Sequence, residues 1–332
     1  MILFWDGKFM YGYEVFHEEL IKNLIESIHD GKSSHSYIFE GEKGLGTLEA
    51  ARLFAAALTC SNTSISPCGT CQTCVESKAD TNPDIIYVRP QKDKKSIGAD
   101  DMRALSDDVA IKPFNSARKV YIIEDGALLT EPAQNTFLKT FEEPPEYAVF
   151  IMLIENLSTL LDTVLSRFTL VHFPVLSEER IKKYITEKYP EEKERLPFLL
   201  KYCSGIPETV DAVINDSEFE SLRDISLEKI FALASRDKRD AFVIQKFLEE
   251  KKENINQILD FWLSFVRDAV LIQLNARDKI MNVDKKDILK DFSSKTNPEI
   301  VLMLYDRLVT AQKMIKRYVN IKGLSLWLSL KK

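Results

Sequence analysis

The sequence predicts an α/β domain with a parallel sheet flanked by helices, followed by regions built from helices alone. Three observations lead to this expectation. In the first half of the chain, short apolar strands alternate with amphipathic helices, which is the pattern of βαβ units. A glycine-rich loop joins the first of these strands to a helix. After Pro174 the strand pattern stops, and only helical periodicity remains.

The expected strands are short apolar runs bounded by turn residues. They lie at residues 37–39, 84–89, 119–125, 147–154 and 170–173. Helices are expected before the first strand, at residues 14–30, and between successive strands, at residues 49–58, 97–111 and 134–145. The double proline of 144–145 stops the last of these helices.

The first strand leads into the layout of a phosphate-binding loop, in the stretch HSYIFEGEKGLGTLEA. In such loops, backbone N–H groups and a helix N-terminus face an anion. Gly41, Gly44 and Gly46 supply the frame of the motif G-x-x-x-x-G-K-[ST]. Thr47 and Leu48 follow, so the lysine that would meet the phosphates and the hydroxyl that would hold Mg²⁺ are both missing. We therefore expect no functional ATP site.

Four cysteines lie close together in the pattern C-x7-C-x2-C-x2-C: Cys60, Cys68, Cys71 and Cys74. Four thiolates can close a tetrahedral Zn²⁺ site, and two-residue gaps let a tight turn aim successive sulfurs at one point. Two disulfides or free thiols are the alternatives, and the expected cytoplasmic location disfavours the disulfides. If all four sulfurs are ligands, no coordination position stays open, so the expected zinc is structural.

Two acids, Glu124 and Asp125, end the strand that begins KVYII. In nucleotide-hydrolysing enzymes this is the Walker B position, where one acid orients the metal and the next polarises the attacking water. The alternative is a strand end with two solvated acids, and the missing P-loop lysine favours it. We therefore expect a vestigial Walker B pair.

Composition and charge are those of an ordinary globular protein. The chain has 332 residues, a net charge of −6, 45% hydrophobic and 29% charged residues. Its apolar runs are too short to span a bilayer, and its first residues, MILFWDGKF, lack the basic region of a signal peptide. We therefore expect a cytoplasmic protein. Basic residues are in excess after residue 220, which fits either ordinary surface variation or a face for nucleic acid or an acidic partner.

Three domains are expected from these patterns. Residues 1–174 would form the α/β domain with an inserted zinc module at 60–74, residues 175–216 a small three-helix lid, and residues 217–332 an all-helical domain. The helices of the last two domains are expected at residues 177–188, 197–203, 208–214, 226–234, 240–249, 255–276, 298–318 and 323–330.

Several of these signatures occur in one characteristic order. The glycine loop after HSYIFE is followed by the four-cysteine module, KVYIIEDGALLT (119–130), NTFLKTFEEPP (135–145) and the SRF triplet (166–168). Together they resemble the bacterial DNA polymerase III clamp-loader subunits of the AAA+ class. The resemblance is strong over residues 15–175 and covers the rest mainly in layout. It implies a RecA-like AAA+ domain, a lid, and a helical collar through which the subunits associate.

Departures from the family pattern favour its inactive member, the delta-prime subunit, over the active gamma/tau subunits. An active subunit would have Lys in place of Thr47 and Ser or Thr in place of Leu48. It would also carry a sensor arginine in the lid, where residues 205–208 read GIPE, and a pair of threonines where residues 154–155 read IE. The resemblance therefore implies a non-hydrolysing subunit.

Arg167, in the Ser-Arg motif, is kept. In the family this arginine reaches across a subunit boundary as an arginine finger, towards ATP held by the neighbour. A guanidinium suits that role because it is always charged and binds phosphate oxygens through two donors. The alternative for Arg167 is a surface salt bridge near a strand.

The resemblance thus implies an accessory subunit of the DNA polymerase III holoenzyme rather than an enzyme with its own active site. Its partners would be the gamma/tau and delta subunits and, through the complex, the sliding clamp and primed DNA, with no membrane. Two alternatives stay open. One is an ATP-hydrolysing gamma/tau-like motor subunit, and the other is a stand-alone zinc-containing DNA-binding protein.

Overall fold

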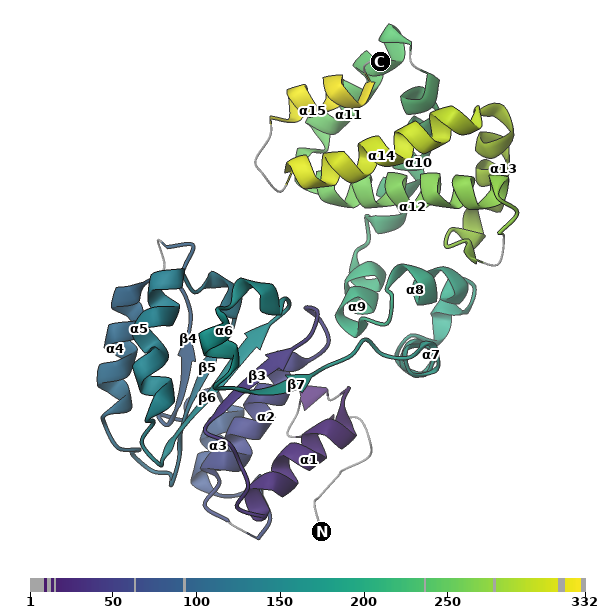
Figure 1. Cartoon of the computed structure of the whole chain (residues 1–332). Helices are drawn as coiled ribbons and strands as arrows, with labels where there is room; N and C mark the ends of the chain where they lie inside the picture. Colours follow the sequence, from purple (N-terminus) through teal and green to yellow (C-terminus); the bar gives the residue numbers. More distant parts are fainter. Residues whose placement is uncertain are drawn as a thin grey trace. The chain divides into compact units, whose positions relative to one another are not determined.

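The computed structural model describes residues 9–10, 13–14, 16–62, 64–91, 94–235, 237–276, 279–315 and 320–329. The first eight residues, which entered the signal-peptide argument, and residues 316–318 of an expected helix lie outside this described part. The chain divides into two compact units, residues 1–177 and 178–332. Strands belong to the first unit, whereas the described part of the second unit is helical (Figure 1).

The first unit is built on a parallel sheet with the strand order β4-β5-β6-β3-β7. The strands are β3 (Ser36–Glu40), β4 (Ile85–Val88), β5 (Lys119–Ile123), β6 (Ala148–Ile154) and β7 (Thr169–His172). β3 lies between β6 and β7, so that Tyr37 is paired with Ile151 on one side and Thr169 on the other. The expected parallel sheet is confirmed. Two short strands, β1 (Phe9–Met10) and β2 (Tyr13–Glu14), form a separate antiparallel pair.

Helices cover both faces of this sheet (Figure 1). The helices of this unit are α1 (Glu18–His29), α2 (Thr47–Thr59), α3 (Gln72–Lys78), α4 (Ala99–Val109), α5 (Glu131–Glu142) and α6 (Asp162–Leu165), with short 3-10 turns η1 (Gly126–Leu128) and η2 (Leu157–Thr159). Successive residues of a strand point to opposite faces. Tyr37 and Phe39 therefore pack against α1 and α2, whereas Ile38 packs on the side of α4 and α5.

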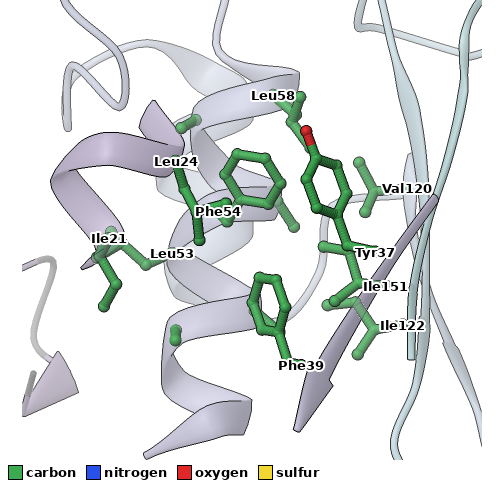
Figure 2. Packing of buried hydrophobic residues seen from close by; sticks show 14 of the residues in the cluster. Ile21, Leu24, Tyr37, Phe39, Leu53, Phe54, Leu58, Val120, Ile122 and Ile151 are labelled. Atoms are coloured by element: carbon green, nitrogen blue, oxygen red, sulfur yellow. The ribbon is translucent and has the colours of Figure 1, made fainter. Parts of the chain in front are cut away.

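The core on the α1 and α2 side is dense in aromatic and aliphatic groups. Figure 2 shows Tyr37 and Phe39 of β3 beside Phe54 of α2, with Leu24 of α1 beyond it. The rings of Tyr37 and Phe54 meet edge to face with centroids 5.1 Å apart. The alanine-rich sequence of α2 allows this helix to lie close to the sheet. This packing fixes the helix whose N-terminus forms the end of the glycine loop.

The second unit consists of helices in its described part. They are α7 (Glu178–Lys188), α8 (Leu196–Tyr202), α9 (Pro207–Asn215), α10 (Phe219–Ser235), α11 (Lys238–Glu250), α12 (Ile255–Gln273), α13 (Lys286–Lys295), α14 (Pro298–Ile315) and α15 (Ile321–Ser329), with 3-10 turns η3 (Pro190–Lys193), η4 (Lys252–Asn254) and η6 (Val283–Lys285). The expected helical character after Pro174 is confirmed. Among the described residues, no helix has both the length and the apolar character that a membrane span requires.

A buried arginine joins the parts of this unit that were expected to form a lid and a collar. Arg223 of α10 donates to Asp284 and to Asn282 at 2.7 Å and 2.8 Å. Its guanidinium also lies 3.7 Å from the ring centroid of Phe198 in α8. The compact unit therefore includes both segments, and their division at residues 216–217 stays a prediction.

Candidate functional site

The candidate site is the edge at which the parallel strands end. Gly41 follows β3, Glu124 follows β5 and Glu155 follows β6. Because β6 lies between β3 and β5, these three strand ends are neighbours. Open α/β sheets bind ligands outside the carboxyl ends of their strands. The structure thus places the glycine loop and the acidic pair, both singled out from the sequence, on one edge.

The glycine loop has backbone angles that favour glycine at two positions. Gly44 and Gly46 have φ values of 92° and 79°, and Gly46 directly precedes the first residue of α2. At Gly41 a β-carbon would come within 2.9 Å of Cβ of Phe173, so close packing requires glycine there. The N–H of Gly41 donates to the carbonyl oxygen of Ile154 at 3.0 Å. The loop is therefore fixed to β6 and leads into the N-terminus of a helix.

Apolar groups pack against this loop beside Gly41, Gly46 and Leu48. Leu48 is half-buried and packs against the core cluster beside α2. The Thr47 methyl carbon lies 3.1 Å from the position that a β-carbon would take at Gly41. A ring carbon of Phe16 lies 3.1 Å from the corresponding position at Gly46. Thr47 offers no cation to a phosphate, and Leu48 offers no oxygen to a magnesium ion.

Both acids after β5 have partners within the chain. Arg89 donates two hydrogen bonds to Glu124, with Nε and Oε2 separated by 2.6 Å. The bond to Glu124 is the main reason that the pKa of Arg89 is raised. Asp125 caps η1, because its Oδ1 accepts the N–H of Ala127 at 3.0 Å. The oxygens of Glu124 are held by an arginine fork, which leaves this carboxylate poorly placed to orient a metal or a water molecule.

The four clustered cysteines come together around the start of α3. The ligand atoms of Cys60, Cys68, Cys71 and Cys74 all lie within 4.8 Å of one another. The Sγ atoms are 3.9 Å apart in both the Cys60–Cys71 and the Cys68–Cys74 pair. A tetrahedral zinc ion with Zn–S distances of about 2.3 Å needs sulfurs about 3.8 Å apart. The spacing of the four sulfurs therefore fits a tetrahedral site, and this group of residues could hold a metal ion.

Hydrogen bonds lower the pKa of two of these thiols, Cys68 and Cys71, whereas burial raises the pKa of Cys60. The backbone N–H of Cys68 donates to Sγ of Cys60 at 3.4 Å. The backbone N–H of Cys71 donates to Sγ of Cys68 at the same distance. Burial acts to raise the pKa of Cys71, but hydrogen bonds from Ser61 and Thr73 outweigh it and lower this pKa to about 5. Cys71 is thus a thiolate at neutral pH, which is the form that binds metals.

Arg167 lies in the turn between α6 and β7. Its guanidinium forms an ion pair with Glu142, the last residue of α5, and donates to the carbonyl oxygen of Thr163. Its side chain keeps 30% of its accessible surface. The surface salt bridge that was the alternative for this residue is present, and part of the Arg167 side chain remains exposed to solvent.

Two further segments singled out from the sequence can be placed, as can the last expected helix. Residues 154–155 end β6, and residues 205–208 lead into α9, which begins at Pro207. The apolar stripe of α15 is divided between core and surface. Leu324 and Leu328 are buried, whereas Leu326 is half exposed. Part of this stripe therefore serves the core of its own unit.

Comparison with known proteins identifies the family. The family described as DNA polymerase III, delta subunit, matches residues 16–177, and the one described as DNA polymerase III, delta subunit, C terminal, matches residues 218–325. The chain belongs to the DNA polymerase III delta-subunit family. The delta' subunit of DNA polymerase III from Bacillus subtilis is 29% identical to it over 310 residues, which cover 92% of each chain. Family membership gives a clamp-loader role in DNA replication, as the sequence led us to expect.

Gamma/tau subunits are also relatives of this delta-family chain. The gamma/tau subunit from Mycoplasma genitalium is 27% identical over 288 residues, which cover 81% of this chain and 48% of the relative. A solved structure, a DNA polymerase III gamma subunit-related protein from Thermotoga maritima, is 18% identical with a TM-score of 0.46. That similarity covers 89% of this chain and 99% of the other.

Two residues that shape the site in this delta-family chain were not found from the sequence. Arg89 binds Glu124 across 35 positions, and Glu142 binds Arg167 across 25. Such pairings depend on which strands and helices become neighbours. A partial signal existed for Arg89, because it is the last residue of the strand expected at residues 84–89 and must therefore lie near the carboxyl edge of the sheet.

Proposed function

We propose that this chain is a delta-prime-type clamp-loader subunit without a working ATP site. The observation that carries the proposal is the loss of nucleotide-binding groups at the carboxyl edge of the sheet. Thr47 and Leu48 replace the lysine and the magnesium ligand, and Arg89 occupies the oxygens of Glu124. ATP with Mg²⁺ needs a cation and metal ligands that these residues do not supply. Similarity to the Bacillus subtilis delta' subunit over 92% of both chains supports the same proposal.

Arg167 would act in trans on ATP bound to a neighbouring gamma/tau subunit. Arginine fingers supplied in trans are worth about 10³ to 10⁵ in rate in well-studied GTPases. The side chain is 30% exposed, and the Glu142 carboxylate and the Thr163 carbonyl hold its guanidinium at the surface. A subunit that hydrolyses nothing could in this way control hydrolysis in the next subunit.

The cysteine cluster would hold one structural zinc ion. Its four sulfurs would be Cys60, Cys68, Cys71 and Cys74, and their mutual separations fit a tetrahedron. Four protein ligands leave no coordination position for water or substrate. The ion would therefore stabilise residues 60–74 and take no part in a reaction.

Within the assembly, residues 1–174 would form the AAA+ domain, residues 175–216 the lid and residues 217–332 the collar. The direct partners would be the gamma/tau and delta subunits, in the cytoplasm. The sliding clamp and primed DNA would be reached through the complex. ATP hydrolysed by the neighbouring subunits would support loading of the clamp onto primed DNA.

Two measurements test this function. Calorimetric titration of the isolated chain with ATP and Mg²⁺ should show neither binding nor turnover. Micromolar affinity with turnover would instead favour a gamma/tau-like motor.

Reconstitution with gamma/tau and delta subunits should give an ATPase that is stimulated by primed DNA and that requires this chain. Tight, salt-dependent DNA binding by the isolated chain, with no affinity for loader subunits, would favour a stand-alone DNA-binding protein.

A further inference from the structure

An exposed loop on the first unit is held from beneath by a buried carboxylate. The loop joins α4 to β5, and its residue Phe114 is 81% exposed. Asp84, which is 1% exposed, accepts the backbone N–H groups of Phe114, Asn115 and Ser116 at 2.6, 2.8 and 2.8 Å. Three such bonds to an ionised carboxylate fix three successive peptide groups. The loop therefore presents a large apolar side chain from a tightly held backbone.

A buried ammonium holds the start of the same loop. Lys119, the first residue of β5, donates from Nζ to the carbonyl oxygens of Asp108 and Ile111 at 3.0 and 3.3 Å. A cation suits this position because the last carbonyl groups of a helix carry partial negative charge. The Lys119 ammonium thus binds carbonyl groups at the start of the loop. The Asp84 carboxylate binds N–H groups further along it.

Asp84 is connected in turn to the cysteine module through Asn82. The Asn82 side chain accepts the N–H of Asp84 at 2.9 Å. Its amide nitrogen donates to the Ser77 hydroxyl at 3.0 Å and to the Thr73 carbonyl oxygen at 3.3 Å, both in α3. A third bond, to Thr59 at the end of α2, measures 3.4 Å. Hydrogen bonds of buried residues therefore connect α3 to the loop, from the Asn82 side chain to the backbone N–H of Asp84 and from the Asp84 carboxylate to residues 114–116.

The helix at which these contacts begin, α3, is too short to be stable by itself. α3 has seven residues, whereas isolated helices shorter than about 12 to 15 residues are marginal in water. Cys71 directly precedes α3, and Cys74 lies within it. A metal ion bound by both sulfurs would fix the first turn of α3, and with it the partners of Asn82.

We propose that the cysteine module serves as a brace for the loop that carries Phe114. In this arrangement the metal fixes α3, α3 fixes Asn82, Asn82 fixes Asp84, and Asp84 fixes the peptide groups of residues 114–116. This inference rests on the proposed metal site for its first step only. A structural zinc ion would in this way order the backbone of residues 114–116, at a part of the surface outside the cysteine module.

Hydrogen exchange of the backbone amides tests the brace directly. Removal of zinc from the full chain with a chelator should accelerate exchange of the Phe114, Asn115 and Ser116 amides about tenfold or more, since protection falls when the bonds to Asp84 open. Amides of β6 and of α12 serve as internal controls and should exchange as before. Unchanged exchange at residues 114–116 after complete loss of zinc would overturn the proposal.

A substitution separates the brace from the metal. Asn82→Ala should keep zinc bound and accelerate exchange at residues 114–116, and Ser77→Ala should do the same to a smaller extent because it removes one acceptor. Asn215→Ala, at an exposed asparagine, is the matched control. If both variants exchange like the control, Asn82 does not transmit anything to the loop. If the unaltered chain binds no zinc, the metal proposal fails, and Asn82→Ala still decides whether α3 holds the loop.

Discussion

The Arg167 guanidinium lies against the Glu142 carboxylate, so that the turn before β7 is joined to the end of α5. Both side chains are partly exposed, Arg167 by 30% and Glu142 by 49%. Exposed ion pairs contribute about 0 to 1 kcal/mol to stability, since solvent screens the charges and two side chains lose freedom. Arg167 is therefore dispensable for the fold, and a strong effect of its removal would report on function.

Replacing Arg167 by Ala should lower the DNA-stimulated ATPase of the reconstituted loader while leaving assembly intact. The charge that would stabilise the transition state at the neighbouring ATP is lost, whereas only a surface ion pair disappears from this chain. Steady-state ATPase with primed DNA, together with gel filtration of the complex, measures both effects.

Arg103→Ala is the matched control for this experiment. Arg103 pairs with Asp100 on the exposed side of α4 in the same unit, and its side chain is 66% exposed. A loader reconstituted with this variant should hydrolyse ATP at the unaltered rate. Glu142→Gln should change the free energy of unfolding by less than about 1 kcal/mol. An Arg167→Ala loader that is as active as the Arg103→Ala loader would falsify the finger assignment.

Metal analysis of the purified chain should find about one zinc ion per molecule, because the four sulfurs fit one tetrahedral site. Cys71→Ser should reduce the zinc content, since a hydroxyl cannot replace a thiolate ligand at neutral pH. Cys203→Ser is the control, because this buried thiol lies in the second unit and outside the cluster. A Cys71→Ser chain that retains all of its zinc would remove Cys71 from the ligand set.

Acid should release the metal. The pKa of Cys71 is lowered from the ordinary value of 9.0 to about 5. A group whose pKa is lowered on folding contributes stability that is complete above pH 9 and is lost as the pH falls to about 5. Metal ligation adds to this trend because protons compete with zinc for the sulfurs. Zinc release to a chelating dye should therefore rise steeply below pH 6, and a zinc content that is independent of pH would contradict the thiolate site.

Strongly periodic elements were predictable from the sequence, and weakly periodic ones were not. The first strand was expected at residues 37–39 and spans Ser36–Glu40, because its apolar run is bounded by turn residues. α3 was missed, since the expected tight turns between cysteines gave no reason to place a helix there. α13 was also missed, because only Leu289 and Phe292 of its charged sequence are buried.

The candidate site divides in the same way between local and distant features. Motifs that occupy consecutive residues, such as Gly41–Gly46, could be read directly. The partners of Glu124 and Arg167 could not, because Arg89 and Glu142 reach them only after the strands have taken their order. The role of Asp84 was equally hidden, since the amides that it binds lie about 30 residues further along the chain.

Restoring a lysine in the glycine loop should not create an ATPase. Thr47→Lys supplies the cation, but Leu48 still packs against the core and Arg89 still holds Glu124. Thr47→Lys combined with Leu48→Thr should also stay inactive in the isolated chain, because Arg89 still holds both oxygens of Glu124 and Asp125 still caps η1. Phosphate release measured with ATP and Mg²⁺ should match that of the unaltered chain. Turnover by either variant would show that the loop had kept more of its chemistry than we propose.

Arg223 should be the most costly to remove among the arginines that the structure describes in the second unit. It is 1% exposed and binds Asp284, Asn282 and the face of Phe198. Removing one partner of a buried ion pair costs about 3 to 5 kcal/mol. Asp284 keeps 23% of its side-chain surface, so its charge is partly solvated after the loss of Arg223, and we expect a cost near the lower end, about 3 kcal/mol. Arg223→Ala should lower the free energy of unfolding by this amount in urea denaturation.

Arg239→Ala is the matched control for this substitution, because its side chain is 90% exposed and pairs only with Asp237 in the described part of the unit. Its effect should stay within about 0.5 kcal/mol. Phe198 belongs to the expected lid and Arg223 to the expected collar, so the Arg223→Ala chain should also lose cooperativity between α8 and α10. Hydrogen exchange in α8 should then accelerate together with that in α10. Acceleration in α10 alone would show that the two segments are stabilised separately.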